Sequence, residues 1–478
     1  MNFGYLKLYI GGSLRDAKSH KKYEIFCPAS EEKISEVAWA DERDAEVALI
    51  AAEKGFKYWS MLSLEDRTTW ILKLRDEISK NQELLRNAIM YEMGKTYAET
   101  LEDIESLSDS LEWYCDAIKN FKGEYLSDYE NTHSHKMIHQ PVGVVIAYLA
   151  WNFPLLNIGF KLGPALASGC SIIIKPSELS PVSAYLLGRI MHEINFPPGV
   201  VNILSGSPEK IGKTLTKSKI PKVITMIGST STGRKIIAES TTSVKRLSLE
   251  LGGNAPFIVF EDADLKAALD LAIDIKFGNC GQICVAANRF FIHEKVYTKF
   301  LNSYILRVKD LKIGFGKEED PDMGPLINAS ARDRMVELLE DAIHHGGKII
   351  IGGKIPREKE KGYWFEPTVL TNLTSKMKLF KQEIFGPIAP FMSFETDDQV
   401  LKMANNTDYG LASYIFTKNN KRIAKFSVDL EFGEVHVNGV KYAIYLPHGG
   451  IKNSGLGHDC SQLALNDYLI KKRVSIAH

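Results

Sequence analysis

The sequence has no net charge, because 59 Lys and Arg residues balance 59 Asp and Glu residues over 478 positions. This balance gives no sign of the basic surface with which proteins bind nucleic acid or an anionic membrane, so neither partner is expected. Cysteine is also scarce, with six residues scattered along the chain, which excludes a disulfide framework. Cys280 and Cys284 have no second Cys or His pair beside them, so no metal site is expected.

Targeting and membrane-spanning segments are also missing. Met1–Ile10 contains no basic segment followed by an apolar core, so no signal peptide is predicted and the cytoplasm is the expected location. The most apolar window, Val142–Phe160, begins with β-branched residues and then contains two asparagines and a proline. It predicts a buried strand that runs into a loop rather than a membrane helix.

Two nucleotide-binding motifs are absent as well. The fingerprint G-x-G-x-x-G occurs nowhere in the chain. Gly206–Thr214 has five residues instead of four between its glycines, and Gly228–Gly233 has the correct spacing but continues with Arg and Lys instead of Lys and Ser or Thr. Neither segment fits a phosphate-binding P-loop, so nucleotide hydrolysis is not expected.

What is present is the pattern of an α/β protein long enough for two or three domains. Apolar spacing predicts strands at Leu6–Ile10 and Tyr23–Cys27, and a helix from Asp41. Three more helices are predicted at Leu64–Lys80, Gln82–Met93 and Tyr97–Phe121. The polar stretch Glu124–Gln140 indicates an extended hairpin that a compact domain does not need for its own core, so it is interpreted as an assembly element.

From residue 141 onward, short β-branched strands alternate with helices, which is typical of a parallel sheet with crossover helices. A second alternation starts near residue 253, with a strand at Phe257–Phe260 and a helix capped by Asp262. The predicted fold class is therefore α/β, with two doubly wound parallel sheets and a small β element. The strands of the first sheet are expected at Val142–Leu149, Ser171–Ile174, Val200–Leu204, Val223–Ile227 and Leu247–Leu251.

Ligands of such sheets bind beyond the carboxyl ends of the strands, where three polar turns occur in this chain. Asn152 follows the first strand and can project its amide towards a developing oxyanion, or close a simple Asx turn. Lys175 and Glu178 flank a proline after the second strand, where they suit a ribose or form an ordinary surface pair. After the third strand, Gly228–Gly233 opens a helix near Thr232, which suits a phosphate or is a plain N-cap.

Cys284 ends a small polar turn, Phe277–Cys284, between two apolar segments. A free thiol with a pKa of about 8.5 is only slightly ionised at neutral pH, so a nucleophilic Cys284 needs activation by its surroundings. The alternative is a buried structural cysteine.

Seven motifs in one order connect these segments, and together they resemble the aldehyde dehydrogenase family along nearly the whole chain. They are Trp151–Pro154, Lys175–Glu178, Gly228–Thr230 with Gly233, Leu249–Gly253, Gly281–Cys284, Glu383–Pro387 and Gly449–Gly455.

The resemblance implies NAD(P)-dependent oxidation of an aldehyde to the acid, through a thiohemiacetal and a thioester on Cys284. Asn152 and the Cys284 N–H would hold the oxyanion, Glu250 would activate water, and Lys161 is placed with these catalytic residues. Glu178 favours NAD over NADP, because a carboxylate accepts from a free 2′-hydroxyl and repels a 2′-phosphate. The implied cofactor-binding residues are Trp151, Lys175, Ser177, Glu178, Gly228, Ser229, Gly233, Leu251, Gly252, Glu383 and Phe385.

The implied domains are a dinucleotide-binding domain (1–122 and 142–252), a catalytic domain (253–455) and an oligomerisation element (123–141 and 456–478) that makes a homodimer or homotetramer. A CoA-acylating relative is disfavoured because such enzymes usually lack the base that Glu250 provides. A non-catalytic scaffold is disfavoured because it needs no such constellation.

The expected substrate residues are Phe160, Ile283, Val285 and His448. Lactaldehyde and succinate-semialdehyde enzymes tend to carry Arg at the position of Phe160, whereas His448 and Asp322–Asn328 resemble the lactaldehyde branch. The first expectation is a small hydroxyaldehyde such as lactaldehyde or glyceraldehyde, and the alternative is succinate semialdehyde or a plain aliphatic aldehyde. His448 could equally be a surface loop residue.

Overall fold

The computed structural model describes residues 1–478, and its first large sheet has the strand order β20-β12-β11-β8-β9-β10-β2-β3. The five central strands are parallel, buried and rich in Val and Ile, as expected for strands covered on both faces. The eight strands are β2 (Leu8–Ile10), β3 (Ser13–Arg15), β8 (Val144–Tyr148), β9 (Ser171–Lys175), β10 (Val201–Ile203), β11 (Pro221–Ile227), β12 (Arg246–Glu250) and β20 (Gly455–Leu456).

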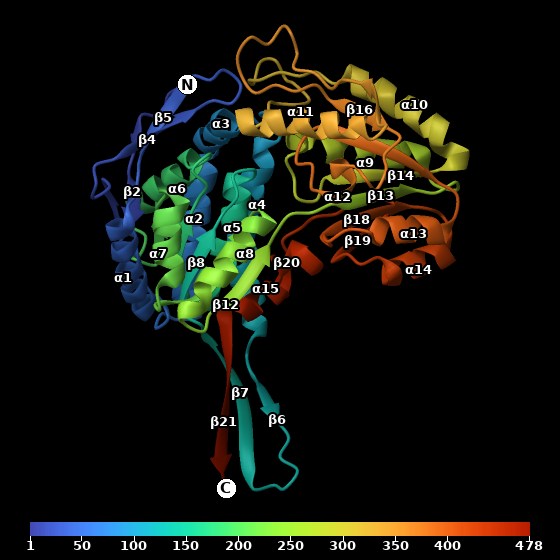
Figure 1. Ribbon diagram of the computed structural model, residues 1–478. Helices are drawn as coiled ribbons and strands as arrows, with labels where there is room; N and C mark the ends of the chain where they lie inside the picture. The colour runs from blue at the N-terminus through green and yellow to red at the C-terminus, as the bar shows by residue number, and fades with distance from the viewer.

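Eight helices accompany this sheet (Figure 1). The helices predicted at Leu64–Lys80 and Gln82–Met93 are confirmed to the residue. The third is shorter than predicted, because Tyr97 lies in a turn and Ile118–Asn120 tightens into a 3₁₀ turn. The helices are α1 (Glu42–Trp59), α2 (Leu64–Lys80), α3 (Gln82–Met93), α4 (Thr100–Ala117), α5 (Pro154–Ser168), α6 (Val182–Glu193), α7 (Lys213–Lys217) and α8 (Thr230–Glu239).

The second large sheet has the order β15-β16-β17-β14-β13-β18-β19 and is parallel except for β15. Figure 1 shows α10 on one side of it and α13 and α14 on the other. Its strands are β13 (Ala255–Val259), β14 (Ala287–His293), β15 (Lys348–Ile351), β16 (Thr368–Thr371), β17 (Ile388–Phe394), β18 (Ala412–Phe416) and β19 (Glu434–Val437). The helices of this half are α9 (Leu265–Phe277), α10 (Glu294–Asp310), α11 (Ala329–His344), α12 (Lys378–Lys381), α13 (Asp397–Asn405) and α14 (Asn420–Asp429).

The predicted cap of the helix after β13 is wrong. Asp264, not Asp262, caps α9 and accepts from the N–H groups of Lys266 and Ala267. Asp262 lies two residues before the N-cap position, and its carboxylate accepts instead from the Thr417 hydroxyl.

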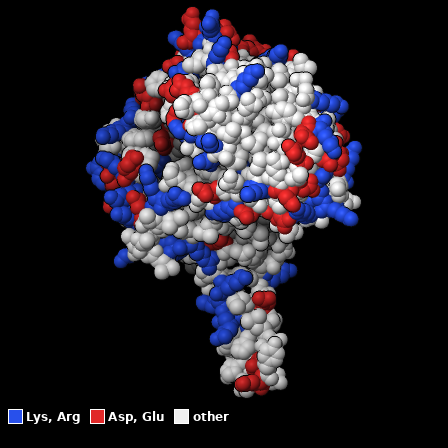
Figure 2. Space-filling model, turned by 45° about the vertical axis from the view of Figure 1, so that its right-hand side comes forward, with Lys and Arg blue, Asp and Glu red and all other residues white.

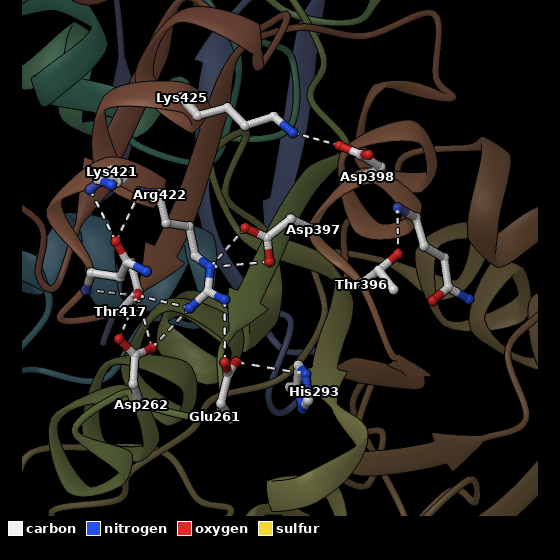
Figure 3. A network of polar contacts seen from close by, with 12 residues as sticks. Glu261, Asp262, His293, Thr396, Asp397, Asp398, Thr417, Lys421, Arg422 and Lys425 are labelled. Carbon is white, nitrogen blue, oxygen red and sulfur yellow. Dashed lines mark hydrogen bonds and ion pairs between the residues drawn. The ribbon is translucent and has the colours of Figure 1, made fainter.

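Arg422 explains why Asp262 points away from α9. Its guanidinium is 11% exposed and lies 3.1 Å from Asp262, 3.2 Å from Glu261 and 3.0 Å from Asp397 (Figure 3). One cation on α14 thus joins the end of β13 to the start of α13. The planar guanidinium suits such multiple carboxylate contacts.

A small sheet with the order β21-β7-β6 forms a stem that projects from the first half of the molecule, with the C-terminus at its tip (Figure 1). Its strands are β6 (Glu124–Leu126), β7 (His133–Pro141) and β21 (Leu469–Ala477), and α15 (Ser461–Tyr468) leads into β21. β7 and β21 pair antiparallel over nine residues. Figure 2 shows Lys and Arg side chains on the upper part of the stem and acidic side chains at its tip, while the body carries both signs of charge around a broad uncharged area.

The predicted strand Leu6–Ile10 is interrupted at Lys7. β1 (Tyr5–Leu6) pairs with β5 (Lys33–Ala38), which also pairs with β4 (Lys22–Phe26), while β2 joins the first large sheet. The predicted strand Tyr23–Cys27 is therefore found one residue earlier as β4, whereas this fourth sheet itself was not predicted, because β1 has only two residues and β5 lay outside the expected strands.

The predicted fold class of two doubly wound sheets with a small β element is confirmed. Two separate apolar clusters are buried, one drawn mainly from residues 6–251 and the other from residues 255–432. The boundaries of the three predicted domains stay a prediction. None of the helices combines the length and the apolar character needed to cross a membrane.

Candidate active site

The three polar strand ends noted in the sequence lie around one cavity of ≈ 860 Å³. β8, β9 and β11 are neighbours in the sheet, but the chain runs from β8 to β9 in one direction and returns to β11 on the other side of β8. Ligands of doubly wound sheets bind at such a switch point. The predicted residues that line the cavity are Trp151, Asn152, Lys175, Ser177, Glu178, Gly228, Ser229, Glu250, Gly252, Cys284, Glu383 and Phe385.

At one part of the cavity, Lys175 and Glu178 form an ion pair with an Nζ–Oε2 distance of 3.3 Å. Burial lowers the pKa of Lys175, and the charge of Glu178 partly opposes that shift. Lys175 contacts only Oε2 of Glu178, so the other carboxylate oxygen stays free for another donor. Glu178 can therefore accept a hydrogen bond from a sugar hydroxyl, and Lys175 can donate one.

The helix after β11 begins at Thr230, two residues earlier than predicted, because Ser229 is its N-cap and accepts from the Thr232 N–H. Helix α8 has ten residues, and Ser229 faces the cavity from its first turn. Free N–H groups and hydroxyls at this point suit an anionic group such as a phosphate.

Gly233 and Leu251 do not line the cavity. A Cβ at Gly233 would lie 2.8 Å from both Leu251 methyl carbons, so the glycine allows α8 to pack closely on the chain after β12. These two predicted cofactor residues therefore act on the shape of the cavity through packing.

Glu383 and Phe385 reach the cavity from the second half of the chain. Glu383 accepts from the Gly253 N–H at 2.9 Å, and burial raises its pKa to about 7, with the charge of Glu250 adding to the rise. Phe385 has a left-handed φ of 55° and packs edge-on against Trp151 at 5.4 Å. Strained backbone at a non-glycine residue clusters at binding sites.

Cys284 lies at the end of a turn in which Asn279, Cys280 and Gly281 all have left-handed φ values, of 47°, 57° and 72°. Gly281 is required here because a Cβ would lie 2.3 Å from the Gly386 carbonyl oxygen. The turn is held by Glu99, whose carboxylate accepts from the Asn279 N–H at 2.5 Å. Strain of this kind persists only where surrounding contacts enforce it.

Asn152 is fixed to the cysteine turn at both its side chain and its backbone. Its Nδ2 donates to the Gln282 carbonyl at 3.0 Å, and its own carbonyl accepts from Asn279 Nδ2 at 3.0 Å. An amide nitrogen carries two hydrogens, so one remains free to donate beside Cys284.

Glu250 and Cys284 meet at the cavity, together with His448. Their carboxylate oxygen, sulfur and ring nitrogen all lie within 4.8 Å of one another. Burial raises the pKa of the Cys284 thiol, the charge of Glu250 raises it further, and His448 opposes the rise. Gly253 permits this meeting, because a Cβ there would lie 2.2 Å from the Cys284 carbonyl oxygen.

His448 is not a free surface residue, since its side chain is only 12% exposed. Its Nδ1 lies 2.7 Å from Glu434 Oε1, and its Nε2 lies 3.6 Å from Glu250 Oε1. Burial opposes protonation of His448, but its contacts with Cys284, Glu250 and Glu434 outweigh it and hold the pKa well above its usual value.

Glu434 also contacts His436, at 3.1 Å. Burial works to raise the pKa of Glu434, but the hydrogen bonds from His436 and His448 outweigh it and bring the pKa to about 2. A chain of polar side chains therefore runs from His436 through Glu434 and His448 to Glu250.

Two predicted substrate residues lie together, with ring centroids of Phe160 and His448 6.1 Å apart. Ile283 and Val285 flank Cys284 and pack on the second apolar cluster. Lys161 is fully buried, does not line the cavity and forms an ion pair with Asp459.

Sequence reasoning missed several residues of the site. Glu434 and His436 lie on β19 outside every motif, and no local signal pointed to them. Glu209 and Lys213 also line the cavity, and the rejected P-loop segment Gly206–Thr214 was the one available hint of a turn there.

Comparisons with known proteins were made on this basis. The family model described as "Aldehyde dehydrogenase family" matches residues 14–474. The mitochondrial succinate-semialdehyde dehydrogenase of Oryza sativa subsp. japonica is 38% identical over 470 residues, which cover 98% of this chain and 89% of that protein.

Two solved structures are equally similar in fold. A 3,6-anhydro-L-galactose dehydrogenase bound to NADP has a TM-score of 0.96 at 36% identity, covering 99% of this chain and 100% of its own. Betaine aldehyde dehydrogenase from Staphylococcus aureus in complex with NAD+ has a TM-score of 0.96 at 32% identity, covering 99% and 95%.

Proposed function

Because the chain belongs to the aldehyde dehydrogenase family, and so oxidises an aldehyde to a carboxylic acid with NAD(P), we propose that Cys284 is its nucleophile. The observation that carries the proposal is the meeting of Cys284 and Glu250 at the cavity where the strand ends converge. A thiol beside a potential base is the arrangement that covalent catalysis requires.

In the first step, the Cys284 thiol loses its proton to solvent in the cavity that it lines, and the thiolate sulfur attacks the aldehyde carbon. The carbonyl oxygen then becomes an oxyanion, for which the free hydrogen of Asn152 Nδ2 and the Cys284 N–H are the donors. A single donor of this kind typically contributes about 3 kcal/mol to the transition state. The hydrogen bond from Asn152 to Gln282 O keeps the amide in position before the substrate arrives.

The dinucleotide fits the cavity by its chemistry, with a helix N-terminus for phosphate at Ser229 and carboxylates for ribose at Glu178 and Glu383. When bound there, NAD(P)+ would supply the hydride acceptor, and the thiohemiacetal carbon on Cys284 would become a thioester carbon on losing its hydride. Phe385 and Trp151 lie beside Glu383 and are placed to cover the nicotinamide end.

Glu250 then takes a proton from water, and the resulting hydroxide attacks the thioester and releases the acid and the thiolate. Its Oε1 is buried and has no hydrogen-bond partner in the protein, so it is free to accept from that water. General base assistance is typically worth on the order of 10² to 10⁴ in rate. Lys161 forms an ion pair with Asp459 outside the cavity lining. It is proposed to assist the reaction only by stabilising the structure around the site.

For the substrate, we propose an aldehyde with a carboxylate at its far end, such as succinate semialdehyde. The rice relative that matches 98% of the chain is named for that activity, which supports this alternative over a hydroxyaldehyde. Protonated His448 has a ring nitrogen within 4.8 Å of the Cys284 sulfur and would attract the anionic end.

A small hydroxyaldehyde is the second candidate, and Phe160 favours it. Where a carboxylate-binding arginine is expected from the resemblance, this chain places an aromatic ring 6.1 Å from His448. His448 is already shared between Glu434 and Glu250, so a neutral hydroxyl competes for it more easily than a third carboxylate does.

A panel of aldehydes distinguishes the two candidates. With NAD in excess, we expect kcat/KM for succinate semialdehyde to exceed that for lactaldehyde, glyceraldehyde and butanal at least ten-fold. Replacing His448 with phenylalanine should lower kcat/KM for succinate semialdehyde more than kcat/KM for butanal. Equal or better turnover of lactaldehyde would instead support the hydroxyaldehyde.

NAD is proposed as the preferred cofactor, with NADP accepted less well, because Glu178 faces the cavity next to Lys175. We expect kcat/KM to be about ten-fold higher with NAD, since a 2′-phosphate would meet the carboxylate. Glu178→Ser should lower the ratio of kcat/KM with NAD to kcat/KM with NADP, or reverse the preference. Glu239→Gln, at another carboxylate of the same cavity, is the matched control and should leave the ratio unchanged. A ratio that favours NADP in the unmodified enzyme would contradict the assignment.

The stem is proposed to join subunits into a homodimer or homotetramer. β21 is an edge strand whose outer side pairs with nothing within the chain, and Tyr125 and Ile476 are 79% and 64% exposed. A three-stranded sheet of this size gains stability by packing on a second copy. Light scattering should give a mass of two or four times 53.5 kDa, and a mass near 53.5 kDa would contradict the proposal.

A further inference from the structure

We propose that Cys284, Glu250 and His448 form a binding site for one divalent transition-metal ion of the zinc type, and that the bound ion inhibits the enzyme. The inhibition rests on the proposed function, because the ion would occupy the nucleophile and the base. Binding itself rests on the geometry of the three side chains alone.

The three donors already have nearly the spacing that zinc requires. Zinc binds sulfur at about 2.3 Å and nitrogen or oxygen at about 2.0–2.2 Å, so neighbouring ligands of a tetrahedral ion lie roughly 3–4 Å apart. His448 Nε2 and Glu250 Oε1 are 3.6 Å apart, and the sulfur lies within 4.8 Å of both. Side-chain adjustments of roughly 1 Å would complete the site.

An independent observation points to a missing ligand at this place. Glu250 is 4% exposed, and its Oε1 is buried without a hydrogen-bond partner. A buried carboxylate oxygen normally has a partner, because an unpaired one costs free energy. The same oxygen is the one that faces His448, so an ion between them would satisfy it.

Glu434 completes the arrangement behind the histidine. It accepts from His448 Nδ1 at 2.7 Å, which turns Nε2 towards Glu250 and Cys284. Histidines that bind metals commonly donate their second ring N–H to a carboxylate, and removing that partner typically lowers metal affinity 10–100-fold. His436 holds the other oxygen of Glu434 and so fixes the carboxylate.

The fourth position of the ion is open to the cavity, since both Cys284 and Glu250 line it. Three protein ligands and one water are a common zinc arrangement. A thiolate and an imidazole select zinc, cadmium or cobalt over magnesium or calcium, which prefer oxygen ligands. On binding, metal bonds form to sulfur, Nε2 and Oε1, and the protons of the thiol and of Nε2 are released to solvent.

The binding test uses the full-length enzyme, freed of metal with a chelator and titrated with Co²⁺ without cofactor or aldehyde. We expect a thiolate-to-cobalt absorption band that saturates at one ion per chain and is displaced by Zn²⁺. The band should vanish in Cys284→Ala and persist in Cys280→Ala, the matched control on the same turn. A band that is absent from the unmodified enzyme, or that survives in Cys284→Ala, would overturn the site.

The inhibition test measures the Zn²⁺ concentration that halves aldehyde oxidation and its reversal by chelator. This concentration should rise at least ten-fold in His448→Phe and in Glu434→Gln, relative to each variant's own activity without zinc, while Mg²⁺ has no effect. An unchanged value in both variants would mean that the thiol alone binds the ion, which contradicts the three-ligand site. If the cobalt band forms but no aldehyde is oxidised, the proposed function fails and the metal site stands.

Discussion

Replacing Cys284 with alanine is expected to abolish aldehyde oxidation, with kcat lowered by at least about 10⁴-fold. Without the sulfur no thiohemiacetal forms, so the aldehyde carbon never becomes the tetrahedral hydride donor. The dinucleotide should still bind, because the other residues that line the cavity are untouched. Reduced-cofactor absorbance measures the first effect, and calorimetric titration with NAD measures the second.

Cys280→Ala is the control for this experiment. Cys280 is buried in the second apolar cluster, four residues from Cys284 on the same turn, and it has no assigned role. Its loss tests whether any disturbance of the strained turn is enough to stop the reaction. If Cys284→Ala kept a tenth of the activity, Cys284 would not be the nucleophile. If Cys280→Ala lost all activity, the loss in Cys284→Ala would be explained by the disturbed turn instead of by the missing sulfur.

The second large effect is expected from Glu250→Gln, which should separate acylation from release of the acid. The first turnover should still produce about one equivalent of reduced cofactor per chain. The steady state that follows should slow by on the order of 10² to 10⁴, because water is no longer activated. Mass spectrometry of the quenched enzyme should find the acyl group on the peptide that contains Cys284.

The same substitution should also change how Cys284 titrates. The charge of Glu250 raises the pKa of the thiol, so its removal lowers that pKa and increases the thiolate fraction at a given pH. The midpoint of the pH profile for alkylation of Cys284 should therefore move to lower pH. Glu239→Gln, which removes a carboxylate elsewhere in the cavity, should leave both burst and midpoint unchanged. A full steady-state rate in Glu250→Gln would assign the base to another residue.

Much of the site could be predicted because strand ends are local features. Asn152, Lys175 and Ser229 each follow an apolar strand, and parallel strands bring their carboxyl ends to one edge of a sheet. The turn before Cys284 was also visible, since Gly281 and Gln282 separate two apolar segments. The structure places Asn152, Lys175, Ser229 and Cys284 around one cavity.

What could not be predicted depends on contacts between distant segments. Glu434 reaches His448 only because β19 pairs with β18 at the far edge of the second sheet. Nothing in the four residues of β19 indicates that a glutamate and a histidine there are partly buried. Likewise, the packing of Gly233 against Leu251 could not be predicted, because α8 meets the chain after β12 only in the folded protein.

The stem also determines when folding can finish during synthesis, because β7 must wait for β21 before the two strands can pair. Pro141 pairs with Leu469, so β7 leaves the ribosome long before the strand that lies beside it. Until β21 follows, β7 has an unpaired edge while both large sheets already have most of their strands, and such edges invite pairing with the wrong chain. The two α/β halves can fold as the chain emerges, whereas the nascent stem needs β21 or protection by a chaperone. Nascent chains that end before β21 should therefore be the species most prone to aggregate.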